Sequence, residues 1–141
     1  MKRAGFTLME ILIALSIVAV LTAVAGYALL PNLQDAKVKA AKVQLSVFKT
    51  SLEVYEADNG APPTMRQGLD ALVRAPETAP VPSNYREGGY LDKLEVPADP
   101  WGRPYAYVVP GPEGKRFDVI CYGADGQPGG EGANADLTCW R

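Results

Sequence analysis

The chain has 141 residues, a net charge of −2 and no histidine. This length accommodates one modest domain plus an extended element, and the acidic balance offers no basic surface for a nucleic-acid backbone. Lack of histidine excludes histidine-dependent nucleophiles and His-ligated zinc, and the two cysteines are too few for a four-cysteine zinc site.

The first predicted element is an apolar helix. Residues from Ile11 to Leu30 are almost wholly apolar, and a helix of about 20 residues spans the roughly 30 Å hydrocarbon core of a bilayer. Lys2 and Arg3 precede it, which predicts a cytoplasmic N-terminus and a body outside the cytoplasmic membrane. The alternatives are a signal peptide, whose apolar region is shorter, at about 7–15 residues, and a buried core helix.

One charge, that of Glu10, stands at the head of this apolar segment. An ionised carboxylate in hydrocarbon costs a few kcal/mol even on lenient insertion scales. Two explanations stay open. A partner charge neutralises the carboxylate, or the side chain extends to the membrane interface, where its cost is small.

A second, amphipathic helical stretch follows Pro31, which is expected to end or kink the apolar helix. Its apolar residues recur at alternating three- and four-residue steps: Val38, Ala41, Leu45, Phe48, Leu52 and Tyr55. Asn59 and Gly60, followed by two prolines, favour a helix end. We therefore expect one long, kinked helix over residues 6–58, whose second half packs on the chain's own core. A coiled-coil seam with another chain is the alternative.

Shorter elements are predicted beyond this helix. Thr64 and Gln67 have capping-box spacing, which indicates a short helix over residues 65–73, and a proline-rich loop follows over residues 75–83.

Two strands are then predicted, over residues 105–109 and 116–122, joined by a hairpin connection rich in proline and glycine. Alternation along the second strand places its side chains on two faces: Phe117, Val119 and Cys121 on one, Asp118, Ile120 and Tyr122 on the other. The predicted fold class is α+β, with a small antiparallel sheet against the amphipathic half of the long helix.

The opening stretch Gly5-Phe6-Thr7-Leu8-Met9-Glu10, followed by the apolar helix, resembles the class III signal of type IV pilins and type II secretion pseudopilins. This resemblance implies the type IV pilin-like fold. It also implies cleavage between Gly5 and Phe6 by a prepilin peptidase, with N-methylation of Phe6. In the family, the glutamate at the position of Glu10 pairs with the α-amino group of a neighbouring subunit.

Two further segments are similar to the major pseudopilin of the type II secretion system, the G-type subunit. They are "GGYLDKLEVPADPWGRPYAY", which contains the recurring motif Asp99-Pro100-Trp101-Gly102, and the tail "YGADGQPGGEGANADLTCW". The resemblance implies a leader over residues 1–5, a transmembrane and assembly helix over residues 6–31 and a periplasmic domain over residues 32–141.

The function implied by this resemblance is structural, not enzymatic. The subunit would polymerise into a pseudopilus, anchored in the inner membrane by a single pass, that drives export of folded proteins across the outer membrane. Its implied partners are other copies of itself, minor pseudopilins, the inner-membrane assembly platform, the prepilin peptidase and membrane lipid, with no nucleic acid. The alternatives are a type IV pilin or competence pseudopilin, and a membrane-anchored periplasmic enzyme that uses Asp99, Asp125 and Asp136.

The C-terminal segment combines acids with many glycines. On spacing alone it is either a flexible acidic loop or a site for a hard cation such as Ca²⁺, which prefers six to eight oxygen ligands. The EF-hand ladder is absent. The resemblance implies a structural calcium ion here, with these expected ligands: Asp125, the Tyr122 carbonyl, Asp136 and Asn134, and Glu131 in reserve.

The two cysteines flank this segment. Cys121 ends a predicted strand and Cys139 follows the loop, so a disulfide between them would close the loop. Such a bridge persists in a periplasmic location and contributes roughly 3 kcal/mol if unstrained. The alternative is two independent small apolar residues.

Overall fold

The computed structural model describes residues 7–140 of the chain, with residues 27–31 described by their backbone alone. The chain divides into two units after Ala36, and each is described by itself. The elements are helix α1 (Leu8–Asn59), strands β1 (Ala106–Val108), β2 (Asp118–Cys121) and β3 (Leu137–Thr138), and 3₁₀ turns η1 (Leu69–Leu72), η2 (Pro112–Gly114) and η3 (Gly132–Asn134).

The predicted long helix is confirmed by α1. It ends where the sequence indicated: the Asn59 Nδ2 donates to the Tyr55 carbonyl at 3.0 Å, and Gly60 adopts a left-handed φ of 82°. Of the two outcomes expected at Pro31, an end to the helix is not seen, because α1 continues through this residue as one long helix. A proline removes a single ladder hydrogen bond, and cooperative helix formation on both sides sustains the element.

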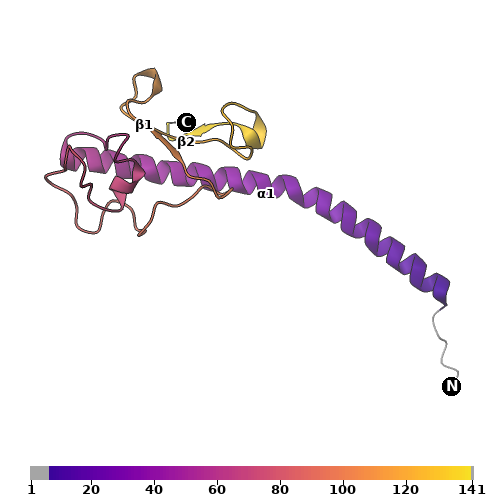
Figure 1. Ribbon diagram of the computed structural model, residues 1–141. Helices are drawn as coiled ribbons and strands as arrows, with labels where there is room; N and C mark the ends of the chain where they lie inside the picture. Colours follow the sequence, from indigo (N-terminus) through magenta and orange to yellow (C-terminus); the bar gives the residue numbers. More distant parts are fainter. Residues whose placement is uncertain (1–6, 141) are drawn as a thin grey trace. The chain divides into compact units, whose positions relative to one another are not determined.

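The second half of α1 carries the core, as its periodicity predicted. Its buried stripe comprises Ala41, Leu45, Phe48, Leu52 and Tyr55, with Val38 half-buried. These side chains share one cluster with residues of the sheet, among them Phe117 and Val119. Figure 1 shows β1 and β2 lying over this half of α1. The stripe is therefore covered by its own chain.

The sheet has three antiparallel strands in the order β1-β2-β3. Tyr107 pairs with Val119 in the first ladder, and Cys121 pairs with Leu137 in the second. The hairpin of β1 and β2 was predicted. The third strand was not, because two residues are too short to show an alternating pattern.

Asp118 is a charged residue that is buried on β2, where it is only 2% exposed. Its Oδ1 accepts hydrogen bonds from the backbone N–H groups of Val119 (2.8 Å) and Cys139 (3.3 Å). The C-terminal segment covers this face, since the indole of Trp140 donates to the Phe117 carbonyl at 2.7 Å.

The expected helix over residues 65–73 is shorter than predicted. The capping box itself forms, since the Thr64 N–H donates to Gln67 Oε1 (2.8 Å) and the Gln67 N–H donates to Thr64 Oγ1 (3.3 Å). Gly68 then adopts a φ of 60°, which is not helical, so only η1 remains. The Gln67 Nε2 instead donates to the carbonyls of Thr78 and Pro80, both at 2.8 Å.

Candidate functional site

The first candidate site is the start of α1, where Thr7 and Glu10 form a reciprocal capping box. Glu10 Oε2 accepts hydrogen bonds from the Thr7 N–H (2.8 Å) and from the Thr7 hydroxyl (3.0 Å). In return, Thr7 Oγ1 accepts the Glu10 N–H at 3.2 Å. A carboxylate in the first turn also complements the positive end of the helix dipole. Glu10 therefore stabilises the start of its own helix, a role that the Thr-x-x-Glu spacing could have indicated.

The helix behind this cap presents apolar side chains on every side. The stretch Leu8–Gly26 is long and apolar enough to cross a membrane, and none of it is buried within the chain. Within this stretch, Ser16 and Thr22 satisfy their hydroxyls by donating to the Ile13 and Val18 carbonyls, as polar groups in lipid must. Gly5 and Phe6 lie outside the described residues, so the cleavage site and the amine partner of Glu10 stay predictions.

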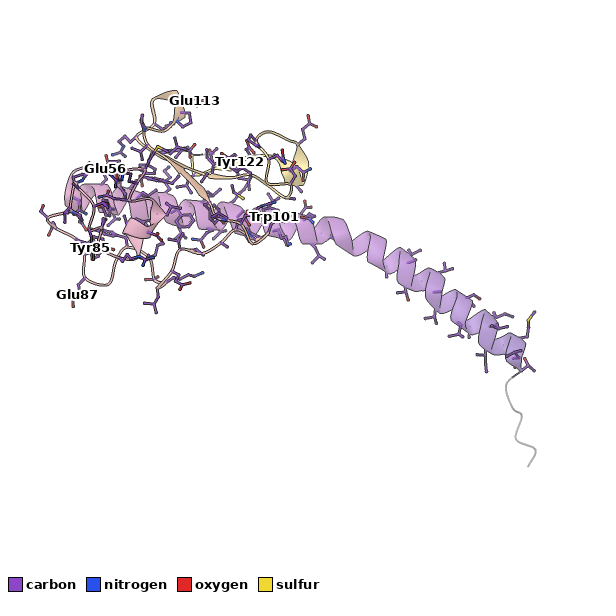
Figure 2. The ribbon with its side chains drawn as sticks, in the orientation of Figure 1. Glu56, Tyr85, Glu87, Trp101, Glu113 and Tyr122 are labelled. Carbon is purple, nitrogen blue, oxygen red and sulfur yellow. The ribbon has the colours of Figure 1, made fainter. Side chains whose placement is uncertain are left out.

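The second candidate site is the loop between β2 and β3, whose two limbs lie together. Figure 2 shows Tyr122 where β2 passes into this loop. The Ala124 N–H donates to the Ala133 carbonyl at 2.9 Å. Gly123 packs so tightly that an added Cβ would stand 2.5 Å from the carbonyl carbon of Asn134. The fold therefore places the Asp125 limb beside the Asn134 limb.

The predicted ligands already take part in the loop's own hydrogen bonds. Asp125 Oδ1 accepts from the Gln127 N–H at 3.0 Å, and Asp136 Oδ2 accepts from the Gly129 N–H at 2.8 Å. The Tyr122 carbonyl accepts from the Gly126 N–H at 2.9 Å. Each carboxylate uses one oxygen in this way, which leaves its second oxygen available to a cation.

The donor chemistry fits a hard cation better than a soft one. Among residues 7–140, no three His, Cys, Asp or Glu side chains gather into a metal centre. What the loop offers is two exposed carboxylates, those of Asp125 and Asp136, with the exposed Asn134 and Glu131 and backbone carbonyls nearby. An oxygen set of carboxylates and carbonyls suits Ca²⁺, whereas zinc favours thiolate and imidazole.

A turn formed by the Asp-Pro-Trp-Gly-Arg segment lies at the base of this loop. Asp99 is 6% exposed, and its Oδ1 accepts the N–H groups of Trp101 (2.9 Å) and Arg103 (2.8 Å). Figure 2 shows Trp101 against α1, where the Lys37 Nζ lies 6.0 Å from its ring centroid. The Asp99 carboxylate is thus a hydrogen-bond acceptor that stabilises the turn, so it is no longer a candidate for the acid of an enzyme active site.

The predicted Cys121–Cys139 disulfide is not present: both cysteines are buried free thiols. The register explains why. Cys121 pairs with Leu137, while the Cys139 N–H donates to the Val119 carbonyl at 3.0 Å. The two cysteines are therefore diagonal neighbours, and such neighbours are farther apart than the roughly 3.5–4.5 Å between Cβ atoms that a disulfide needs.

Each thiol instead approaches a different buried carboxylate. Cys139 Sγ lies 3.2 Å from Asp118 Oδ1, and Cys121 Sγ lies 3.6 Å from Asp99 Oδ2. Burial, with the nearby Asp118 acting in the same direction, raises the pKa of the Cys139 thiol to about 12. Burial likewise raises the pKa of Cys121. Both thiols are protonated at neutral pH and are not activated nucleophiles.

Two family models match this chain. The model described as type II secretion system (T2SS), protein G, matches residues 28–140, and the prokaryotic N-terminal methylation motif matches residues 1–26. Together they cover both candidate sites.

Individual relatives agree along nearly the whole chain. Type II secretion system core protein G of Vibrio cholerae serotype O1 is 44% identical over 140 residues, covering 99% of this chain and 93% of the relative. The core protein G of Pseudomonas aeruginosa is 41% identical, covering 99% and 96%. The crystal structure of the major pseudopilin from the type 2 secretion system of enterohaemorrhagic Escherichia coli is similar, with a TM-score of 0.66 and 36% identity. That match covers 79% of this chain and 93% of the other.

Proposed function

The chain belongs to the protein G family of the type II secretion system and is a structural subunit of the pseudopilus, not an enzyme; we propose that its polymerisation through α1 drives export of folded proteins across the outer membrane. The observation that carries this proposal is the unpartnered apolar surface of Leu8–Gly26 with one capped carboxylate at its head. A helix that exposes apolar side chains on all sides needs lipid or other helices around it.

We infer a single-pass location in the inner membrane, with a cytoplasmic N-terminus and a periplasmic domain. Lys2 and Arg3 before the span support this orientation. Cleavage by a prepilin peptidase between Gly5 and Phe6 would create the α-amino group at Phe6. The second oxygen of Glu10 would then pair with that group on a neighbouring copy, since Thr7 binds Oε2.

Assembly would involve other copies of the chain, minor pseudopilins and the inner-membrane assembly platform, with membrane lipid around the unassembled subunit. Nucleic acid is not among the proposed partners, because the net charge of −2 offers no basic footprint.

The polymerisation role is tested by replacing Glu10 with alanine in cells that form the pseudopilus. We expect Glu10→Ala to accumulate in the membrane yet form few filaments and secrete little, because no carboxylate meets the neighbour's amine. Glu77→Ala, an exposed acid outside both candidate sites, is the control and should assemble normally. Normal filaments from Glu10→Ala would contradict the proposed pairing.

We also propose that the loop holds a structural Ca²⁺ ion through Asp125, Asp136, Asn134 and the Tyr122 carbonyl, with Glu131 in reserve. The ion would supply positive charge that ties the two limbs of the loop together. Support comes from the meeting of the two limbs and from the oxygen donors that they offer.

Native mass spectrometry of the full chain in detergent, with and without a chelator, tests the calcium proposal. One bound ion should disappear with chelator and in Asp125→Ala, with a lower melting temperature in both cases. Asp92→Ala, an exposed acid away from the loop, should keep the ion. Absence of a bound ion at millimolar calcium would overturn the site while leaving the assembly proposal intact.

A further inference from the structure

The side chain of Arg103 joins two segments that are distant in sequence. Its Nη2 donates to the Gly123 carbonyl at the start of the C-terminal loop, while its Nε lies 3.7 Å from Asp99 Oδ2. Gly126 lies against the same guanidinium, because an added Cβ there would stand 2.5 Å from Nη1. One planar cation therefore contacts both the turn and the loop.

The backbone that carries Arg103 is itself held in place. Asp99 Oδ1 accepts the Arg103 N–H at 2.8 Å, and the Asp99 N–H donates to the Arg103 carbonyl at 2.7 Å. With the Asp99 side chain 3% exposed, this pair of bonds is shielded from water, which strengthens it. The turn thus projects the guanidinium toward the loop from a rigid base.

We propose that Arg103 is a positioning residue for the C-terminal loop, holding residues 123–126 in the shape that presents the Tyr122 carbonyl and Asp125 to a cation. This inference rests on the proposed calcium site. The hydrogen bond from Arg103 fixes the direction of the Gly123 carbonyl, and contact with Gly126 fixes the turn in which the Gly126 N–H donates to the Tyr122 carbonyl.

We expect the positioning of the loop by Arg103 to affect calcium binding more than the repulsion between its charge and the ion. A guanidinium near a calcium site repels the ion, but the Arg103 side chain is 36% exposed and its charge is screened by salt. A loop that is already ordered without the ion loses less conformational entropy when the ion binds, so binding is stronger. Partners that orient metal ligands from outside typically contribute 10–100-fold in metal affinity. Loss of Arg103 should therefore weaken calcium binding.

The test compares Arg103→Lys and Arg103→Gln in the full chain in detergent, using Ca²⁺ titration and amide hydrogen exchange of the metal-free protein. We expect both variants to bind calcium about 10–100-fold more weakly, because lysine keeps the charge but lacks the planar fork. Both should also exchange the amides of residues 124–127 faster without calcium. Arg74→Gln, which removes an exposed arginine paired with Asp70, is the control and should change neither readout.

The two Arg103 variants together separate position from charge. If Arg103→Lys bound calcium as tightly as the wild type, the charge of Arg103 and not its shape would determine calcium affinity. If Arg103→Gln bound calcium more tightly, repulsion by Arg103 would dominate. Either result would overturn the inference. If the wild type binds no calcium, the calcium site fails, and unchanged exchange in Arg103→Gln would then overturn the positioning role as well.

Discussion

Thr7 and Glu10 show how a residue that is costly in lipid is stabilised before any partner arrives. Three hydrogen bonds link the two residues, so the carboxylate already has hydrogen-bond donors at the start of its own helix. The hydrogen bonds from Thr7 hold Oε2 of Glu10 in place, so the carboxylate does not rotate freely. One side chain would thus serve both as a helix cap and as the proposed assembly contact.

Replacement of Thr7 by valine should destabilise the first turn of α1. Loss of an N-cap hydroxyl costs about 1 kcal/mol of helix stability, so the amides of residues 8–11 should exchange faster in detergent micelles. Thr22→Val removes a hydroxyl that bonds the Val18 carbonyl within the helix and should leave those amides unchanged. Equal exchange in Thr7→Val and wild type would show that the capping box does not order the helix start.

At the scale of elements, α1 combines two chemically different halves in one backbone. The first half exposes its apolar side chains, whereas the second buries one stripe under the sheet. Phe48 is fully buried in that stripe and meets Tyr105 edge to face, with ring centroids 5.0 Å apart. The opposite face of the same turn is open, since Val47 is 44% exposed.

Truncation on these two faces should have unequal effects. Phe48→Ala should lower the free energy of unfolding by about 3–5 kcal/mol, because it leaves a cavity where the helix meets the sheet. Val47→Ala on the outer face should change it by less than about 1 kcal/mol. Chemical denaturation of the full chain in detergent measures both, and equal losses would contradict the assignment of the buried stripe.

For the whole molecule, stability should fall at alkaline pH. The pKa of the Cys139 thiol is raised by burial to about 12, against about 8.5 in an unfolded chain. Between these values the unfolded state has released the proton and the native state has not. The unfolded state therefore binds fewer protons, and the free energy of unfolding decreases as pH rises.

Cys139→Ala should make this decrease less steep, by up to about 1.4 kcal/mol per pH unit. The window from about pH 9 to 10 isolates the thiols, because tyrosine in an unfolded chain titrates near pH 10. Burial also raises the pKa of Tyr85, to about 12, so the tyrosines extend the same trend at higher pH. Melting temperatures are measured for wild type and Cys139→Ala across this pH window. An equal decrease with pH in both proteins would contradict the raised pKa of the Cys139 thiol.

Local patterns in the sequence were sufficient for the helix, the core stripe, the Asn59–Gly60 end and the β1–β2 hairpin. Each depends on a period or a cap within a few residues, so neighbouring residues alone encode it. The motif at the start of the chain likewise identified the family through adjacent residues. The same reasoning overestimated the length of the helix after Thr64, where the non-helical φ of Gly68 decided the outcome.

Contacts between distant segments were decided by the tertiary structure alone. Burial of Asp118 depends on the last strand, and the diagonal placement of Cys121 and Cys139 depends on a register that no local pattern specifies. The bond from Arg103 to the Gly123 carbonyl joins residues 20 positions apart. The sequence by itself determined what this protein is and which elements it forms, because those properties are periodic and local. Which polar groups meet was decided only when the sheet closed over α1, because pairing depends on the register of strands that are far apart along the chain.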